Sequence, residues 1–209
     1  MKTLTKETQD LISPKKALKL LKDGNERFVK NLKINRDLLQ QANETSEGQH
    51  PFAVILSCID SRTSVELIFD QGLGDVFSIR IAGSIINDDI LGSMEFSCKL
   101  AGAKIIVVLG HTNCGAIKAA CDDAKMGNLT GLIKKIHPAI SLEKTEAENR
   151  TSKNSSFVKK VTALNIENAV SEIKKRSPIL KKMLELGEIT VIGGIHNIMT
   201  GEVEFYECC

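Results

Sequence analysis

The stretch Phe52-Ala53-Val54-Ile55-Leu56 decides the fold, because it is strand-sized and continuously apolar. Such a run is typical of a strand that is covered on both faces, whereas a strand with one solvated face alternates. Two more strands are predicted at Val76–Ile81 and Ile105–Leu109, with a helical pattern between them around Ile90–Leu100. Strands that alternate with helices predict an α/β chain with a mostly parallel central sheet flanked by helices.

Both ends of the chain add elements to this centre. Ser13-Pro14 is an N-cap followed by proline at the first helical position, and apolar spacing continues that helix to about Leu32. Ile189–Ile192 and Val203–Tyr206 flank a Thr200-Gly201 turn, which predicts a strand and its hairpin partner at an edge of the sheet. Further helices are predicted at Ala116–Lys125, Leu129–Ile140, Ser156–Lys175 and from Ser177 to near Gly187.

Length and composition fit one α/β domain over residues 1–209, with an N-terminal helical arm at 1–47 and a core at 48–209. Polar stretches at Asn43–Pro51 and Ser141–Ser155 predict connections, the second one a mobile loop. A net charge of +2 does not favour a nucleic-acid partner. The N-terminus has no apolar segment of a secretory signal and no apolar run approaches a membrane span, so we expect a cytoplasmic protein.

Two motifs with metal-binding side chains follow two of the strands. Cys58-Ile59-Asp60-Ser61-Arg62 comes immediately after the first strand, and His111-Thr112-Asn113-Cys114-Gly115 immediately after the third. Open parallel sheets bind ligands at the carboxyl ends of their strands, so both motifs are expected at one edge. Two thiolates and an imidazole form a Cys₂His set, which binds Zn²⁺ at catalytic sites with a fourth position open. A helix starting behind Cys114 would favour its thiolate form.

Each cysteine also has a simpler interpretation. Cysteine is among the most buried residue types, so Cys58 taken alone would be assigned to the core. The two motifs at equivalent strand ends, with Asp60 and Arg62 beside one of them, indicate a metal site, but the residues alone leave both interpretations open. Cys98 and Cys121 lie in helical patterns and are expected to pack, and Cys208-Cys209 is expected to be an exposed tail.

The pair of motifs, Cys-x-Asp-x-Arg and His-x-x-Cys-Gly, resembles the defining motifs of the beta-class carbonic anhydrases. The resemblance is specific from about Gly48 to Cys121 and looser over Gly193–Phe205. The segments that fit the family around the two motifs are Ile68–Phe77, Arg80–Gly83, Leu91–Glu95 and Val107–His111. The resemblance implies the fold of that family, and reversible hydration of carbon dioxide to bicarbonate and a proton by attack of a zinc-bound hydroxide.

The resemblance also implies roles for single residues. Cys58, His111 and Cys114 match the ligands of one Zn²⁺ per chain. Asp60 and Arg62 match a catalytic carboxylate–guanidinium pair, in which Asp60 accepts the hydrogen of the hydroxide and Arg62 holds Asp60 away from the metal. If that pair breaks, Asp60 could become the fourth metal ligand, in a closed state that some family members adopt.

Four positions match substrate-binding residues of the family, namely Gln49, Phe77, Ala82 and Gly115. Gln49 corresponds to a glutamine that hydrogen-bonds the substrate, Phe77 to an apolar wall with Ala82 near it, and Gly115 to a backbone N–H that contacts the bound anion. In the family, the glutamine and phenylalanine reach the zinc from the neighbouring subunit. The resemblance therefore implies a homodimer or homotetramer with shared active sites, whose small-molecule partners are CO₂ and bicarbonate.

The chain departs from the family pattern in three places. Ile81 and Ser84 replace asparagines of many members, which is expected to alter local packing or the subunit interface. Ile55 stands where some members carry the tryptophan of an inhibitory bicarbonate pocket, so we expect no such pocket here. Non-competitive inhibition by bicarbonate that mutation of Arg80 relieves would contradict this expectation.

Other functions stay open at this point. A zinc hydrolase of carbon disulfide or carbonyl sulfide could use the same scaffold, and so could a non-catalytic zinc-binding homologue. A purely structural site would use four protein ligands and would not need the pair Asp60–Arg62. A cysteine redox enzyme is disfavoured because the chain has no Cys-x-x-Cys. His50, His137 and His196 could relay protons, but none is assigned that role.

Overall fold

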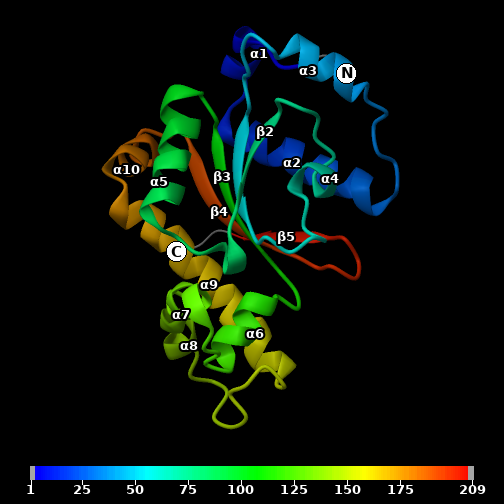
Figure 1. Ribbon diagram of the computed structural model, residues 1–209. Coiled ribbons are helices and arrows are strands. Elements are labelled where there is room, and N and C mark those ends of the chain that lie inside the picture. Colours follow the sequence, from blue (N-terminus) through cyan, green and yellow to red (C-terminus); the bar gives the residue numbers. More distant parts are fainter. Residues whose placement is uncertain (1–2, 207–209) are drawn as a thin grey trace.

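The computed structural model describes residues 3–206, which are organised around one five-stranded sheet (Figure 1). Its strand order is β2-β1-β3-β4-β5, and only β5 runs antiparallel to its neighbour. The strands are β1 (Ala53–Ser57), β2 (Val76–Arg80), β3 (Ile105–His111), β4 (Thr190–His196) and β5 (Val203–Tyr206). This confirms the predicted mostly parallel sheet with a C-terminal hairpin strand at its edge. The expected exposed tail at Cys208-Cys209 lies outside the described residues.

Helices cover both faces of the sheet (Figure 1). One face packs against α5 (Asp88–Glu95), α9 (Ser155–Arg176) and α10 (Pro178–Glu185), and the other against α2 (Pro14–Val29) and α4 (Val65–Ile68). The remaining elements are α1 (Lys6–Asp10), α3 (Leu38–Glu44), η1 (Ala82–Ser84), η2 (Phe96–Leu100), α6 (Gly115–Cys121), α7 (Gly127–Ile133) and α8 (His137–Leu142). None of the described helices is both long and apolar enough to cross a membrane.

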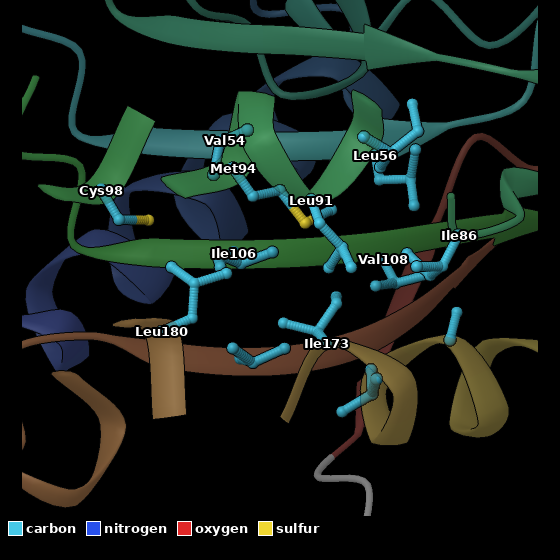
Figure 2. Packing of buried hydrophobic residues seen from close by; sticks show 14 of the residues in the cluster. Val54, Leu56, Ile86, Leu91, Met94, Cys98, Ile106, Val108, Ile173 and Leu180 are labelled. Atoms are coloured by element: carbon cyan, nitrogen blue, oxygen red, sulfur yellow. The ribbon is translucent and has the colours of Figure 1, made fainter. Parts of the chain in front are cut away.

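The central strands are buried along their whole length, as the continuous apolar runs predict. Alternate side chains point to opposite faces, so Val54 of β1 and Ile106 of β3 meet Met94 and Ile173 from the helices of one face (Figure 2). Cys98 lies in the same buried layer, which confirms the prediction that its side chain packs in the core (Figure 2). A core this continuous holds the ends of neighbouring strands in a defined register.

Several helix limits differ from the predictions for local reasons. Helix α2 ends at Val29 because Asn31 adopts a left-handed backbone conformation with φ 53°. Helix α6 ends at Cys121, shortly before the left-handed Asp123 at φ 48°. The helix predicted over 129–140 is divided into α7 and α8, and the one predicted over 90–100 begins at Asp88 and becomes a π-helix over η2. Helix α3 takes in the start of the predicted connection 43–51.

The polar connection before α9, expected to be a mobile loop, is organised around one buried carboxylate. Glu143 is only 2% exposed. Its carboxylate accepts hydrogen bonds from the backbone N–H groups of Thr145 and Glu146 and from Arg150 Nη1 at 2.8 Å. The loop is therefore tied together by its own hydrogen bonds.

Candidate metal centre

Three side chains from two loops converge beyond the carboxyl ends of β1 and β3. The donor atoms of Cys58, His111 and Cys114 lie within 4.8 Å of one another, and all three residues are buried. The two Sγ atoms are 3.9 Å apart. A tetrahedral ion with Zn–S bonds of about 2.3 Å would hold two sulfurs roughly 3.8 Å apart. The sulfur pair therefore has the spacing of one edge of a tetrahedral zinc site.

The orientation of His111 also fits a metal ligand. His111 is the last residue of β3, rather than the first residue after the strand, because β3 continues to pair with β4 as far as His196. Its Nδ1 lies 3.0 Å from the carbonyl oxygen of Thr112. Its Nε2 is buried with no hydrogen-bond partner among residues 3–206. An imidazole that donates from Nδ1 to a carbonyl keeps its Nε2 lone pair free for a cation, so this donor set fits Zn²⁺.

The two thiols are electrostatically unequal. A hydrogen bond from the Cys114 thiol lowers the pKa of Cys58, and a hydrogen bond from the Gly83 backbone acts in the same direction. The hydrogen bond to Cys58, together with burial, raises the pKa of Cys114 and outweighs the backbone N–H groups of Ala116 and Ile117 at the start of α6. The expectation that this helix start favours the Cys114 thiolate is therefore wrong for the metal-free chain. The Gly83 N–H lies 3.5 Å from the Cys58 sulfur. The site therefore stabilises negative charge on Cys58, the form in which a thiol binds a metal.

Asp60 lies at the rim of this cluster in a bidentate pair with Arg62. Arg62 Nε donates to Asp60 Oδ1 at 3.0 Å and Nη2 donates to Oδ2 at 2.8 Å, and the Arg62 backbone N–H reaches Oδ1 as well. These hydrogen bonds hold the pKa of Asp60 well below its usual range. Oδ2 is 4.0 Å from His111 Nε2. Asp60 is thus an ionised carboxylate beside the cluster, and it is not one of the three donors that lie within 4.8 Å of one another.

The four residues matched to substrate binding lie in two different places. Ala82 begins η1, next to Gly83, and Gly115 begins α6, where an added Cβ would meet open space. Phe77 pairs with Val54, which precedes Cys58 along β1 by four residues, or about 13 Å at 3.3 Å per residue. Gln49 is exposed and comes before the amino end of β1, whereas Cys58 follows the carboxyl end of that strand. One chain by itself therefore does not place Gln49 and Phe77 at the cluster.

The two replaced family asparagines have different surroundings. Ser84 is buried and holds a left-handed backbone with φ 50°, a conformation that asparagine tolerates better than most residues. Its hydroxyl donates to the Leu109 carbonyl oxygen at 3.1 Å. Ile81 packs against two apolar clusters, the one that contains Met94 and Ile173 and the one that contains Cys58 and Cys114. Ile55, at the position of the family's tryptophan, is completely buried in the core beneath α2 and α4.

The sequence analysis did not assign a role to two residues that contact the loop Cys58–Arg62, called the first loop below; the second loop is His111–Gly115. Arg80, at the end of β2, donates to the backbone carbonyl oxygens of Cys58 and Asp60, and the Thr63 hydroxyl lies near the same two oxygens. The only available signal was an arginine ending a strand expected beside the one that precedes the motif. His196 is also notable, because it is 3% exposed and neither ring nitrogen has a hydrogen-bond partner among the described residues.

The chain is similar to known proteins in both sequence and structure. A sequence family described as "Carbonic anhydrase" matches residues 53–203. A carbonic anhydrase of Mycolicibacterium smegmatis is 33% identical over 198 residues, which cover 92% of this chain and 93% of the relative. A carbonic anhydrase 2 of Mycobacterium tuberculosis is 32% identical over 195 residues, with 90% and 91% covered.

Solved structures agree with the sequence relatives. The beta-carbonic anhydrase CafA of Aspergillus fumigatus has a TM-score of 0.72 and 25% identity, with 82% of both chains covered. The beta-carbonic anhydrase CcaA has a TM-score of 0.71 and 26% identity, with 91% of this chain and 95% of that chain covered. The similarity therefore extends from the motifs to the arrangement of the whole sheet.

Proposed function

Because this chain belongs to the beta-carbonic anhydrase family, we propose that it hydrates carbon dioxide reversibly to bicarbonate and a proton, using one Zn²⁺ held by Cys58, His111 and Cys114. The spacing of these three buried donors carries the proposal. Three protein ligands leave a tetrahedral ion one position for solvent or substrate, which a structural four-ligand site would not. A zinc ion bound there would supply a nucleophile at neutral pH by lowering the pKa of a coordinated water.

Asp60 and Arg62 have complementary tasks in this proposal. Asp60 is ionised and accepts a hydrogen bond from the attacking water or hydroxide, which orients the oxygen lone pair towards the substrate carbon. Its Oδ2 is the oxygen on the side of His111 Nε2, at 4.0 Å. Arg62 occupies both carboxylate oxygens from the other side, and this bidentate contact keeps Asp60 from ligating the metal. A closed state with Asp60 as the fourth ligand would require that contact to break.

A second copy of the chain completes the site in this proposal. Strand β2 is an edge strand with no neighbour on its outer side among the described residues. Phe77 lies on it in contact with Phe96, which is 53% exposed, with ring centroids 6.2 Å apart. A homodimer or homotetramer formed across this edge would bring Gln49 and Phe77 of one subunit to the metal of its neighbour. Ala82 and Gly115 would line the same pocket from within each chain.

Mixing two variants of reduced activity tests the shared site. Gln49→Ala impairs the pocket that Gln49 completes in the neighbouring subunit, whereas Asp60→Asn impairs its own subunit's site. When subunits of the two variants are exchanged, some sites carry neither change, so activity above that of either parent is expected. A protein that is monomeric in sedimentation, or mixtures that never exceed the parents, would contradict the shared site.

Stopped-flow CO₂ hydration with a pH indicator, on protein of measured zinc content, tests the activity itself. Carbon disulfide hydrolysis measured on the same samples distinguishes the related hydrolase reaction. We expect rapid CO₂ hydration and slow or absent carbon disulfide turnover. Fully zinc-loaded protein that does not hydrate CO₂ would overturn the proposal.

A further inference from the structure

The guanidinium of Arg80 lies against the turn that carries Cys58 and Asp60. Its Nε donates to the Cys58 carbonyl oxygen at 3.1 Å and its Nη2 to the Asp60 carbonyl oxygen at 2.7 Å. The register of β1 and β2 pairs Arg80 with Ser57, the residue immediately before Cys58. The sheet therefore delivers the arginine to the turn, and its rigid fork of N–H groups can bond two carbonyls at once.

Thr63 contacts the same two oxygens without replacing Arg80. The Thr63 residue is buried, and its hydroxyl lies 3.2 Å from the Cys58 oxygen and 2.9 Å from the Asp60 oxygen. A hydroxyl has one proton, so it can fully satisfy only one of the two carbonyls. Arg80 offers a separate N–H to each oxygen. The arginine thus holds both carbonyls at the same time.

The other contacts of the turn are hydrogen bonds from its neighbours: the Thr63 N–H donates to the Asp60 carbonyl oxygen at 3.0 Å, and the Gly83 N–H donates to the Cys58 sulfur. Ile59, between Cys58 and Asp60, is 60% exposed and provides no buried apolar anchor. The two carbonyls bond Arg80 and Thr63, while the Cys58 sulfur and the Asp60 carboxylate lie on the side of the metal cluster. A rotation of these peptide groups would displace a metal donor and the carboxylate together.

We propose that Arg80 is a positioning residue, which fixes the Cys58–Asp60 turn and thereby sets where the Cys58 sulfur and the Asp60 carboxylate stand relative to the metal. The inference rests on the proposed zinc site but not on turnover. Partners that orient metal ligands typically affect metal affinity by about 10–100-fold when they are mutated. Arg80 contacts no metal donor atom, so its effect passes through the backbone of the turn.

Three variants test this inference. Arg80→Met removes both hydrogen bonds, Arg80→Lys keeps the charge but loses the fork, and Arg176→Met is a control at another exposed arginine, whose partners are Asp88 and Glu172. Zinc affinity is measured by competition with a chelator, and donor geometry by the visible absorption of the Co²⁺-substituted protein. We expect zinc affinity to fall about tenfold in Arg80→Met and severalfold in Arg80→Lys, with altered Co²⁺ spectra and no change in Arg176→Met.

Rescue and coupling separate positioning from general destabilisation. Added guanidinium ion is expected to restore part of the zinc affinity of an Arg80→Gly variant at a concentration that leaves wild type unchanged. Thr63→Val combined with Arg80→Met is expected to lose a different amount of zinc affinity from the sum of the single changes, because both residues hold the same oxygens. If Arg80→Met fails to fold, Arg80→Lys provides the same comparison.

Wild-type zinc affinity and Co²⁺ spectra in both Arg80 variants would overturn the inference. Non-competitive bicarbonate inhibition that Arg80→Lys abolishes, with zinc affinity unchanged, would overturn it too and assign Arg80 to anion binding. Since zinc binding and spectra need no turnover, wild type that binds zinc without hydrating CO₂ would end the proposed function while these measurements still decide the role of Arg80.

Discussion

The two loops that carry the candidate metal donors are held in different ways. The second loop is an extension of the sheet, because His111 ends β3, the Thr112 N–H donates to the His196 carbonyl at 3.0 Å, and the Ile198 N–H donates to the Thr112 hydroxyl at 3.1 Å. The first loop leaves the sheet at Ser57, and its turn is held by one backbone hydrogen bond, from the Thr63 N–H to the Asp60 carbonyl oxygen, and by the side chains of Arg80 and Thr63. Backbone pairing is shared with the fold, whereas side-chain contacts can be removed one at a time.

Because of this difference, we expect mutations in the two loops to have different consequences for the fold. Damage to the second loop is expected to weaken the end of the sheet and the metal site together. Damage to the first loop is expected to weaken metal binding and catalysis while the sheet stays intact.

Removing a metal donor is expected to abolish zinc binding whichever of the two loops carries it. Cys58→Ser and Cys114→Ser should each lose stoichiometric zinc. CO₂ hydration should fall by more than about a hundredfold, because mutating even a residue that only orients a metal ligand typically lowers metal affinity or activity by about 10–100-fold. Cys98→Ala is the matched control, because Cys98 lies in the apolar core. Zinc content by mass spectrometry and stopped-flow rates check the result, and a Cys58→Ser protein with full zinc and full activity would contradict the ligand assignment.

Asp60→Asn acts on the first loop without removing a donor. The amide cannot accept hydrogen bonds as strongly as the carboxylate and does not pair with Arg62 as an ion. We expect CO₂ hydration to slow by roughly tenfold or more, with zinc content close to one per chain. Stopped-flow rates and zinc analysis on the same sample check both. Loss of zinc at an unchanged rate per bound zinc would show that Asp60 supports the metal rather than the reaction.

Acid is expected to destabilise the strand beside the second loop through His196. Burial, followed by the nearby His111, lowers the pKa of His196 from 6.5 to about 4. Between these pH values the unfolded chain binds a proton that the folded chain does not, so the free energy of unfolding decreases as the pH falls. We expect His196 to account for roughly 2–3 kcal/mol of that decrease.

Urea unfolding of metal-free protein at several pH values measures this contribution. His196→Gln is the comparison, because glutamine does not titrate, and its free energy of unfolding should decrease less between pH 6.5 and pH 4. Parallel pH dependences in wild type and His196→Gln would show that His196 is not the titrating group.

Thr112→Val tests the second loop by removing the hydroxyl that accepts the Ile198 N–H. An unmade hydrogen bond of this kind costs about 1 kcal/mol, so urea unfolding should show a loss of that size. Zinc affinity should change less than in Arg80→Met, because the Thr112 carbonyl that bonds His111 Nδ1 is retained. Thr112→Ser keeps the hydroxyl and should resemble wild type. A larger loss of zinc affinity in Thr112→Val than in Arg80→Met would show that side-chain contacts matter more for metal binding at the second loop than at the first.

Prediction from sequence succeeded where the pattern is local. The apolar runs around Val54 and Ile106 predicted central buried strands, and the Thr200-Gly201 turn predicted the hairpin at the sheet edge. Prediction was weaker at helix ends, since a left-handed residue such as Asn31 or Asp123 stops a helix without changing its apolar spacing. The division between α7 and α8 likewise left no clear trace in hydrophobicity.

The candidate site was also predicted only in part from sequence. Its motifs indicated the convergence of Cys58, His111 and Cys114, because both follow parallel strands whose carboxyl ends share one edge. The contact of Arg80 with the Cys58 turn was not predicted, since it depends on the register of β1 against β2. The neighbouring positions of His196 and His111 likewise depend on the pairing of β3 with β4.

Periodicity and residue type within short segments were enough to predict the sheet, its edge hairpin and the residue types of the candidate metal donors. The groups that contact those donors, namely Arg80 and Thr63 at the first loop and the end of β4 at the second, became visible only in the folded chain. The physical reason is that strand register is set by packing summed over the whole core, and a shift of one residue would turn each of these side chains to the opposite face.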